Sequence, residues 1–393
     1  MFNNYIFRIF SILIVILLVA GCREKKNNIA DTYTDVVPII IDIKEAIQNK
    51  VDYKYSDILF DSITFIPLEC FIDDFVLALD NSSIMRITPN FFFVQGKSGR
   101  TPLLCYDHNG KFIRKIAERG PGPGEFGRLR DVAVDEEKGI VYVLDRSDKK
   151  IYKYNFEGVF LEVINLSNHA DKIAVNLAGQ LLIHFPNWDG DLQYSCLLFD
   201  NKGDTINKLN NNIFYGLDAE RTKFGYEGLR YIYNDRIHVK GKSDTLYVVE
   251  NNRFIPKYIF STGEKLSKKL SRVEYDEKIS ISYIHETDSK VFFHFGIDKT
   301  GYWSYYDKKT GKAFSARGAI INDMYDRKEI NLSMFTYQYN DEIIMVRGSS
   351  FNMDKLKENV SPSKYLEISN MLDSVYKKDD DPVILSILHL KKQ

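Results

Sequence analysis

The residues best suited to ligand chemistry lie in one loop, Asn187–Asp191, where a tryptophan stands beside two carboxylates. An aromatic face such as that of Trp188 next to Asp189 and Asp191 is how many sugar-binding and cation-binding sites are built. The two aspartates lack the further acidic positions of a calcium-binding loop. The alternative is a tryptophan that packs on a neighbouring repeat. The loop is therefore one candidate ligand site with two open interpretations.

A second candidate is the glycine-rich stretch Gly120–Gly127 with the basic residues around it. It lacks the Lys-Ser or Lys-Thr pair of a phosphate-binding loop, and its two prolines have no N–H group to donate. The stretch is interpreted as a connecting loop. Arg119 and Arg128 flank it and are candidates for the rim of a ligand surface.

Catalytic constellations are not recognisable. The sequence contains no Gly-x-Ser-x-Gly elbow, and no serine or cysteine has an activating local context. The seven histidines are scattered, but His184, His238 and His294 occupy strand-like runs in successive repeats and are candidates to meet at a shared metal. We assign no catalytic residue, no metal ligand and no cofactor, and favour a non-enzymatic role while leaving enzymatic activity open.

The N-terminus has the pattern of an export signal. An uncharged, mostly apolar run, Ile9–Ala20, follows Arg8 and is shorter than the ~20 residues that span a bilayer. Its end, Leu18-Val19-Ala20-Gly21-Cys22, places small residues before a cysteine, as in a lipobox. Residues 1–21 are predicted to be a lipoprotein signal peptide and Cys22 the lipidated residue. The alternative is an ordinary cleaved secretory peptide.

Composition bounds the rest of the chain. Residues 22–54 are predicted to form a tether and N-terminal extension, because the stretch after Cys22 is polar and charged. The chain is 44% hydrophobic, so a large core is feasible, and its net charge of −1 gives no overall field that would favour nucleic acid. Cys70, Cys105 and Cys196 are an odd, unclustered set in apolar runs and are predicted to be buried free thiols.

An internal repeat governs the region from residue 55 onward. Each unit has an aromatic residue, a polar turn and a glycine, followed by a new strand-like run, and the glycines recur 45 to 60 residues apart. That period is typical of propeller blades. The glycine supplies the positive φ of a tight hairpin turn, and a preceding Asp or Asn can accept hydrogen bonds from the turn. The turn glycines are Gly110, Gly158, Gly203, Gly263 and Gly311.

The strand-like runs predict an all-β fold, a six-bladed β-propeller of four-stranded antiparallel blades. The strand 63–68 has no blade of its own, and pairing it with the final run 383–388 would close the ring and remove exposed sheet edges. Residues 354–378 have apolar residues at helical spacing, which predicts a short helix inserted near the C-terminus. The blades are expected near residues 80–118, 127–166, 170–209, 227–269 and 279–318, and from about 333 to the end.

The repeat at Gly120-Pro121-Gly122-Pro123-Gly124-Glu125-Phe126, with the strands 131–154 and Gly158, resembles the NHL-type repeat. The chain more closely resembles the six-bladed β-propeller lipoproteins of Bacteroidota, and Asp244–Tyr247 and Lys378–Val383 extend that resemblance over most of residues 55–393. The third and fifth blades depart from it, because the glycine-rich connecting loop is missing there. The resemblance implies a recognition module.

Three functional hypotheses follow. The first is a binding module for a protein or glycan, anchored to a membrane of the cell envelope by its N-terminal lipid. The outer membrane is the expected location, with a periplasmic or a surface-facing domain, and no nucleic-acid partner is expected. The second is a metal-dependent hydrolase or lyase of the lactonase-like propeller kind, which requires polar side chains that converge at the channel mouth. The third is a structural subunit of an outer-membrane complex, which requires an exposed apolar patch.

Overall fold

The structure is a computed structural model of the 393-residue chain, which divides into two units, residues 1–36 and 37–393. The first unit, with Cys22, lies outside the described residues. The described residues are 37–52, 60–72, 75–79, 83–96, 101–187, 191–200, 202–211, 214–215, 229–241, 243–261, 269–270, 280–297, 300–317, 335–347, 354, 357–358, 360–376 and 383–391.

Three sheets are antiparallel meanders of four consecutive strands. Short polar turns separate runs rich in β-branched and aromatic residues, which favours this local pairing. The first sheet has β6 (Ile84–Ile87), β7 (Phe91–Gln95), β8 (Leu103–Asp107) and β9 (Phe112–Ala117). The second has β10 (Leu129–Asp135), β11 (Ile140–Asp145), β12 (Lys150–Asn155) and β13 (Phe160–Asn165). The third has β14 (Lys172–Val175), β15 (Leu181–His184), β16 (Tyr194–Phe199) and β17 (Thr205–Asn210).

Two larger sheets have five and nine strands. The five-stranded sheet has β24 (Ser280–Glu286), β25 (Lys290–Ile297), β26 (Thr300–Asp307), β27 (Lys312–Ala316) and β2 (Lys50–Val51). The nine-stranded sheet has β1 (Ile39–Asp42), β22 (Arg253–Ser261), β21 (Thr245–Glu250), β20 (Arg236–Lys240), β19 (Leu229–Tyr233), β28 (Phe335–Tyr339), β29 (Glu342–Arg347), β30 (Ile384–Leu390) and β3 (Phe60–Pro67). A single bridge between Ile232 and Tyr339 joins its two halves, β1–β22–β21–β20–β19 and β28–β29–β30–β3.

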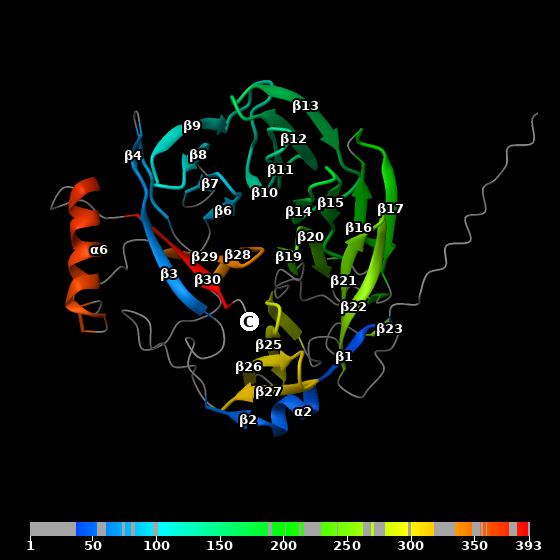
Figure 1. Ribbon diagram of the computed structural model, residues 1–393. Helices are drawn as coiled ribbons and strands as arrows, with labels where there is room; N and C mark the ends of the chain where they lie inside the picture. Colours follow the sequence, from blue (N-terminus) through cyan, green and yellow to red (C-terminus); the bar gives the residue numbers. More distant parts are fainter. Residues whose placement is uncertain are drawn as a thin grey trace, which may run out of the picture. The chain divides into compact units, whose positions relative to one another are not determined.

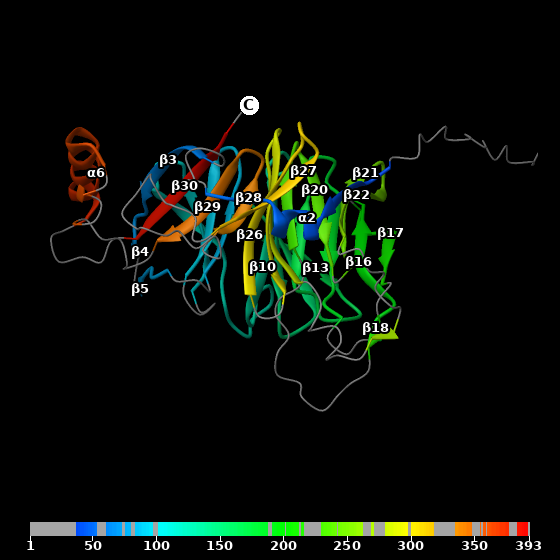
Figure 2. The same ribbon diagram turned by 90° about the horizontal axis from the view of Figure 1, so that it is seen from below.

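The sheets stand around a common centre, with β6, β10, β14, β19 and β28 innermost and β9, β13 and β17 outermost (Figure 1). Seen from a perpendicular direction, the strands of neighbouring sheets stand side by side (Figure 2). This is the arrangement of a β-propeller, as the repeat predicts. The hydrophobic core lies between neighbouring sheets: Phe93 and Cys105 of the first sheet, for example, share a buried cluster with Val132 and Val143 of the second.

The hairpin turns follow the predicted chemistry. Gly110 has a φ of +83°, and a Cβ atom there would lie only 2.0 Å from the backbone oxygen of Pro67, so no other residue fits without a shift of the chain. The Asp107 carboxylate accepts backbone hydrogen bonds from Asn109 and Lys111, both of 2.9 Å. Gly158, Gly203 and Gly311 also have positive φ, whereas Gly263 lies outside the described residues.

The first long strand pairs with the last. β3 is antiparallel to β30, with Ile63 opposite Leu388 and Phe65 opposite Ser386. The expected pairing of the early and final runs is therefore present. The expected helix is also present as α6 (Pro362–Val375), which begins after the N-cap Ser361 and buries Ile368 and Leu372 in a cluster with Phe60 and Ile63 of β3.

The N-terminal extension contains more structure than its polar start suggests. After β1 comes α2 (Ile43–Gln48), whose N-cap Asp42 accepts a 2.8 Å hydrogen bond from the backbone N–H of Lys44. β1 pairs in parallel with β22, and β2 pairs in parallel with β27, so this segment covers the outer edges of two sheets. Residues 38–51 are thus an integral part of the fold.

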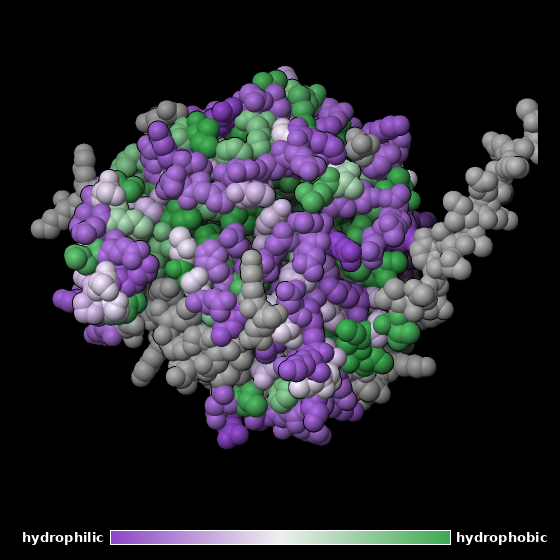
Figure 3. All heavy atoms as spheres, viewed as in Figure 1, coloured by the Kyte–Doolittle hydropathy of each residue, from purple (hydrophilic) through white to green (hydrophobic). Residues whose placement is uncertain are grey.

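Four short strands form two further pairs, β4 (Phe71–Ile72) with β5 (Phe75–Val76) and β18 (Phe214–Tyr215) with β23 (Lys269–Leu270). Cys70, Cys105 and Cys196 are buried free thiols, as predicted. None of the described helices has the length and apolar character needed to cross a membrane. On the face shown in Figure 3, hydrophilic side chains predominate and hydrophobic ones form small separate patches.

Candidate functional site at the centre of the ring

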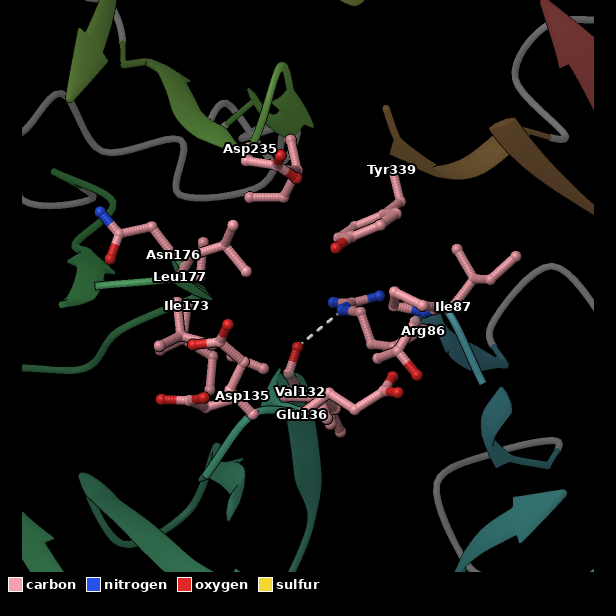
Figure 4. Close-up of a pocket in the computed structure, with 18 of the residues that line it drawn as sticks. Arg86, Ile87, Val132, Asp135, Glu136, Ile173, Asn176, Leu177, Asp235 and Tyr339 are labelled. Atoms are coloured by element: carbon pink, nitrogen blue, oxygen red, sulfur yellow. Dashed lines mark hydrogen bonds between the residues drawn. The ribbon is translucent and has the colours of Figure 1, made fainter. Parts of the chain in front are cut away.

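A cavity of about 300 Å³ opens at the centre of the ring, where the innermost strands end. Its residues come from β6, β10, β14, β19, β28 and the turns that follow them (Figure 4). In a propeller, first strands from successive sheets converge on the axis, so residues far apart in the sequence meet there. We name this cavity the central pocket.

Hairpin turns between first and second strands form the rim of the central pocket. Asp235 lies in a two-residue turn, and both Asn234 and Asp235 have positive φ, as type I′ hairpins require. Asp135 ends β10, and Glu136 and Glu137 begin the turn between β10 and β11. Four carboxylates from two sheets therefore surround the mouth of the pocket.

The rim carboxylates differ in how they are held. Glu136 accepts hydrogen bonds from the Asn90 side chain and, at 3.4 Å, from the Asn90 backbone N–H. Asp235 accepts a 2.9 Å hydrogen bond from the Asn340 side chain. Asp135 lies 3.2 Å from the ammonium group of Lys138, so one of the four rim carboxylates is paired with a lysine. The mouth is consequently negative.

The floor of the central pocket is apolar with one cationic and one aromatic group. Val132, Ile173 and Ile232 are buried at its base. Arg86 and Tyr339 extend into the space from different strands (Figure 4). An apolar floor below a negative rim fits a ligand with an aliphatic stem and a cationic end, such as a lysine or arginine side chain.

Beneath this floor, one buried carboxylate holds two arginines. Asp131 is 1% exposed, forms an ion pair with Arg86, and accepts hydrogen bonds from Arg230 through both oxygens, one at 2.6 Å. It also accepts a 2.8 Å hydrogen bond from the backbone N–H of Ile173. Arg86 and Arg230 donate in turn to the backbone oxygens of Val132 and Ile173, both at 2.6 Å. These bonds link the innermost strands of four sheets or sheet halves.

A second acidic residue lies at the beginning of β14. The Asp171 carboxylate is 2.6 Å from Nδ1 of His184 and 4.0 Å from the guanidinium of Arg130. Burial alone would raise the pKa of Asp171, but His184, Lys172 and Arg130 hold it below its usual value. Together with the Asp131 group, these residues form what we name the channel cluster: Arg86, Arg130, Asp131, Asp171, Lys172 and Arg230.

Another buried carboxylate lies where the sheet halves of β19–β22 and β24–β27 meet. Glu286 accepts hydrogen bonds from the hydroxyls of Tyr231 and Tyr258, at 2.9 and 2.7 Å, and from the ammonium groups of Lys257 and Lys308, at 2.9 and 2.7 Å. Burial would raise the pKa of Glu286, but the charges around it hold that pKa at about 2. We name this group, with its further members His238, Tyr233 and Asp288, the Glu286 network.

The three histidines considered as metal ligands do not meet. His184 pairs with Asp171, His238 stacks on Tyr231 with ring centroids 4.7 Å apart, and His294 is 2.6 Å from the Ser282 hydroxyl. Within the described part of the chain, no group of three His, Cys, Asp or Glu side chains is placed to hold a metal ion. These candidate histidines therefore do not share a site at the axis, because each one contacts a partner within its own sheet or in the segment that leads into that sheet.

The other candidate residues lie elsewhere. Arg119 and Arg128 are exposed, and the Arg119 side chain donates a 2.8 Å hydrogen bond to the backbone oxygen of Gly127. This hydrogen bond and the buried Phe126 side chain hold the glycine-rich stretch in place. The stretch connects β9 to β10, as predicted. Asp191 is exposed, and Trp188 and Asp189 lie outside the described residues. Arg119, Arg128 and Asp191 do not line the central pocket, so their role in binding stays a prediction.

Sequence reasoning singled out His238 of the Glu286 network, as a candidate metal ligand, but not Asp131, Asp171 or Glu286, the carboxylates at the centre of these groups. One signal was present: a charged residue inside an otherwise apolar strand. Arg86 in Ile84–Ile87 and Lys172 in Lys172–Val175 have that pattern, although nothing local shows that the two strands face the same axis.

Two solved structures are similar to this chain. One described as a "Putative exported protein" of Bacteroides fragilis NCTC 9343 is 21% identical, covers 91% of this chain and 100% of its own, and has a TM-score of 0.64, which supports the fold alone. A member of the DUF4221 family from Bacteroides vulgatus is 10% identical, covers 85% of this chain and 98% of its own, and has a TM-score of 0.49.

Curated proteins offer no match to this sequence. A family described as "Domain of unknown function (DUF4934)" matches residues 38–387, which is nearly all of the second unit. The chain therefore belongs to the DUF4934 family.

Proposed function

We propose that this protein is a lipid-anchored binding module of the cell envelope, which captures a basic side chain of a partner protein in the central pocket. The lipobox ending in Cys22 supports the anchor, and the exported relative from Bacteroides fragilis agrees with a location outside the cytoplasm. The outer membrane is the proposed site of attachment. The propeller is proposed to be a six-bladed ring of the NHL-like kind, in which β28, β29, β30 and β3 form the closing blade.

The observation that carries the binding proposal is the combination of a negative rim with an apolar floor in one cavity at the ring axis. A lysine or arginine side chain matches this arrangement, because it has an apolar stem and a charged end. Its methylene stem can pack on Val132 and Ile173 while its charge meets Asp235 and Glu137. Glycan binding is the competing outcome, since sugars need hydrogen bonds and an aromatic face more than charge.

Fluorescence anisotropy with a labelled peptide of alternating lysine and glycine tests the proposal on the full chain in detergent. The matched probe is the same peptide with acetylated lysines, which keeps the stem and removes the charge. We expect the charged peptide to bind and the acetylated one to bind much more weakly, with affinity that falls as salt is raised.

Asp235→Asn and Glu137→Gln remove exposed rim charges without disturbing the core. Each is expected to weaken binding of the charged peptide about two- to fivefold, since an exposed ion pair contributes roughly 0.5–1 kcal/mol. Glu157→Gln, at the exposed outer turn between β12 and β13, is the control and should bind as the unmodified chain does. Equal binding of both peptides, or no effect of the rim variants, would contradict the proposal. An oligosaccharide that binds at the same pocket would favour glycan recognition.

A further inference from the structure

One rim carboxylate of the central pocket already holds a cation from its own chain. The side chain of Asp135 is 2% exposed, and the ammonium group of Lys138 lies 3.2 Å from its Oδ2 atom. The other rim carboxylates that bond a side chain, those of Glu136 and Asp235, bond neutral asparagine amides. Asp135 therefore differs from them in being paired with a positive charge.

The two oxygens of the Asp135 carboxylate are held differently. Oδ1 accepts a 3.1 Å hydrogen bond from the backbone N–H of Lys138, in the turn that follows β10. Oδ2 is buried and makes no hydrogen bond with any residue that the structure describes, so its counter-charge is the Lys138 ammonium group. A buried carboxylate needs a positive charge beside it, but another cation can supply that charge equally well.

The Lys138 side chain is placed so that it can leave this position. It is 42% exposed, and it extends from the turn 136–139 between β10 and β11. Its ammonium group lies against Gly179 in the turn between β14 and β15, where a Cβ atom would overlap it. Asn176 and Leu177 of that same turn line the central pocket. The ammonium group therefore lies at the edge of the pocket, between the turns of two neighbouring sheets.

We propose that Lys138 is an internal competitor for the central pocket: its ammonium group occupies the Asp135 carboxylate until a basic side chain of the partner displaces it. The inference rests on the proposed function and adds the residue that regulates its affinity. Asp135 keeps a counter-charge before and after the exchange, and the released ammonium group of Lys138 is hydrated. The partner's charge then lies between Asp135 and Asp235, which are on opposite sides of the pocket (Figure 4).

Competition lowers the affinity of the pocket, because each binding event must first break the pair of Lys138 with Asp135. Removing the lysine should therefore tighten binding, and this effect should depend on the Asp135 carboxylate. A general repulsion between Lys138 and a cationic ligand would instead act whether or not Asp135 is charged. Combining the two substitutions in one protein separates these explanations.

Fluorescence anisotropy with the labelled peptide of alternating lysine and glycine, on the full chain in detergent at fixed ionic strength, measures the Kd of each variant. Lys138→Met should lower the Kd about three- to tenfold, because the pair that it removes is partly buried. In the Asp135→Asn background the same substitution should change the Kd by less than about twofold. Lys138→Arg keeps the charge and should not tighten binding. Lys150→Met is the matched control, because Lys150 pairs with Asp148 at 3.5 Å beyond the other end of β11, and it should leave the Kd unchanged.

Two outcomes would overturn the inference: the same Kd for Lys138→Met and the unmodified chain, or equal tightening with and without the Asp135 carboxylate. Lys138→Gln is a second neutral variant for the same measurement, and urea denaturation shows which variants are folded. Failure of the proposed function has a different pattern, in which neither the unmodified chain nor Lys138→Met distinguishes the charged peptide from the acetylated one. If Asp235→Asn weakens binding of the charged peptide but Lys138→Met does not tighten it, the proposed function stands and the inference fails.

Discussion

The Glu286 network and the channel cluster both place charge inside the ring, but their charges are arranged differently. In the network, two lysines face Glu286, and Asp288 accepts a hydrogen bond from Tyr233, whose ring lies 5.5 Å from the Lys257 ammonium group and 5.4 Å from that of Lys308. Burial and the nearby Lys257 lower the pKa of His238 to about 3, so it adds no charge at neutral pH. Positive and negative charges are therefore matched.

In the channel cluster, burial and the charge of Arg230 lower the pKa of Lys172 to about 7. The comparison suggests that the bonded charges of the Glu286 network stabilise the contact between two sheets, whereas Lys172 is buried at a cost to stability. Buried polar groups that are all satisfied stabilise a single arrangement, and unsatisfied ones are costly unless something binds them.

The largest expected effect comes from removing the centre of the matched group. Glu286→Gln leaves two lysines near each other without their carboxylate, and the free energy of unfolding should fall by about 3–5 kcal/mol. Urea denaturation followed by tryptophan fluorescence measures it. Glu250→Gln is the control, because Glu250 forms an exposed ion pair with Arg236 at 3.3 Å, and it should change stability by less than about 1 kcal/mol.

The same network fixes the response to acid. Because the folded-state pKa of Glu286, about 2, lies below its ordinary value of 4.5, its stabilising contribution is present above pH 4.5 and is lost as the pH falls toward 2. The Glu286→Gln protein should lack that part of the acid sensitivity. Equal stability of the unmodified and Glu286→Gln proteins at pH 7 would mean that the Glu286 network does not stabilise the fold.

The next effect has the opposite sign. Lys172→Met should raise the stability of the protein at pH 7, because it removes a cation that burial and the charge of Arg230 disfavour. The folded-state pKa of Lys172, about 7, lies below 10.5, so the penalty is absent at high pH, grows as the pH falls below 10.5 and is complete below 7. The gain is at most about 4 kcal/mol, at about 1.4 kcal/mol per pKa unit.

Lys308→Met is the matched comparison for that variant. It removes a lysine from the balanced network, so it should lower stability, by about 1–3 kcal/mol. Urea titrations of both lysine variants between pH 6 and 10 measure the change in the free energy of unfolding for each. If both substitutions lower the stability of the protein, the distinction between matched and unmatched charge does not hold.

The smallest expected effect tests the edge of the network. Tyr233→Phe removes the hydroxyl that donates to Asp288 and keeps the aromatic ring beside Lys257 and Lys308. We expect a loss of about 1 kcal/mol in the free energy of unfolding, as for one hydrogen bond. Tyr194→Phe, whose hydroxyl bonds the exposed Ser167, should cost less. A larger effect at Tyr194 would contradict this ranking.

Local chemistry made much of the fold predictable. The turn at Gly110 needs only a glycine with positive φ and an aspartate just before it, and α6 shows its 3.6-residue period within one segment. β1 was missed, because Ile39–Asp42 becomes a strand only through pairing with β22, more than two hundred residues away. The N-cap Asp42 was the local sign of structure there.

The sites depend on long-range contacts. Asp131 lies in an ordinary alternating strand, and its importance appears only when Arg86 and Arg230 reach it from other sheets. The carboxylates of the central pocket come from turns that local spacing cannot bring together, such as those of Asp135 and Asp235. Periodicity therefore predicts the sheets of a propeller, but not which of their charges share the axis.

The pairing of β3 with β30 also sets an order of events in time. Ile63 and Leu388 are neighbours in the folded protein but are separated by almost the whole chain. A ribosome that releases β3 first leaves it without its antiparallel neighbour until β30 emerges, and closing so long a loop is slow. Until then β3 has a free strand edge, so the seven-residue strand β30 decides when this edge of newly made chains stops being prone to aggregate.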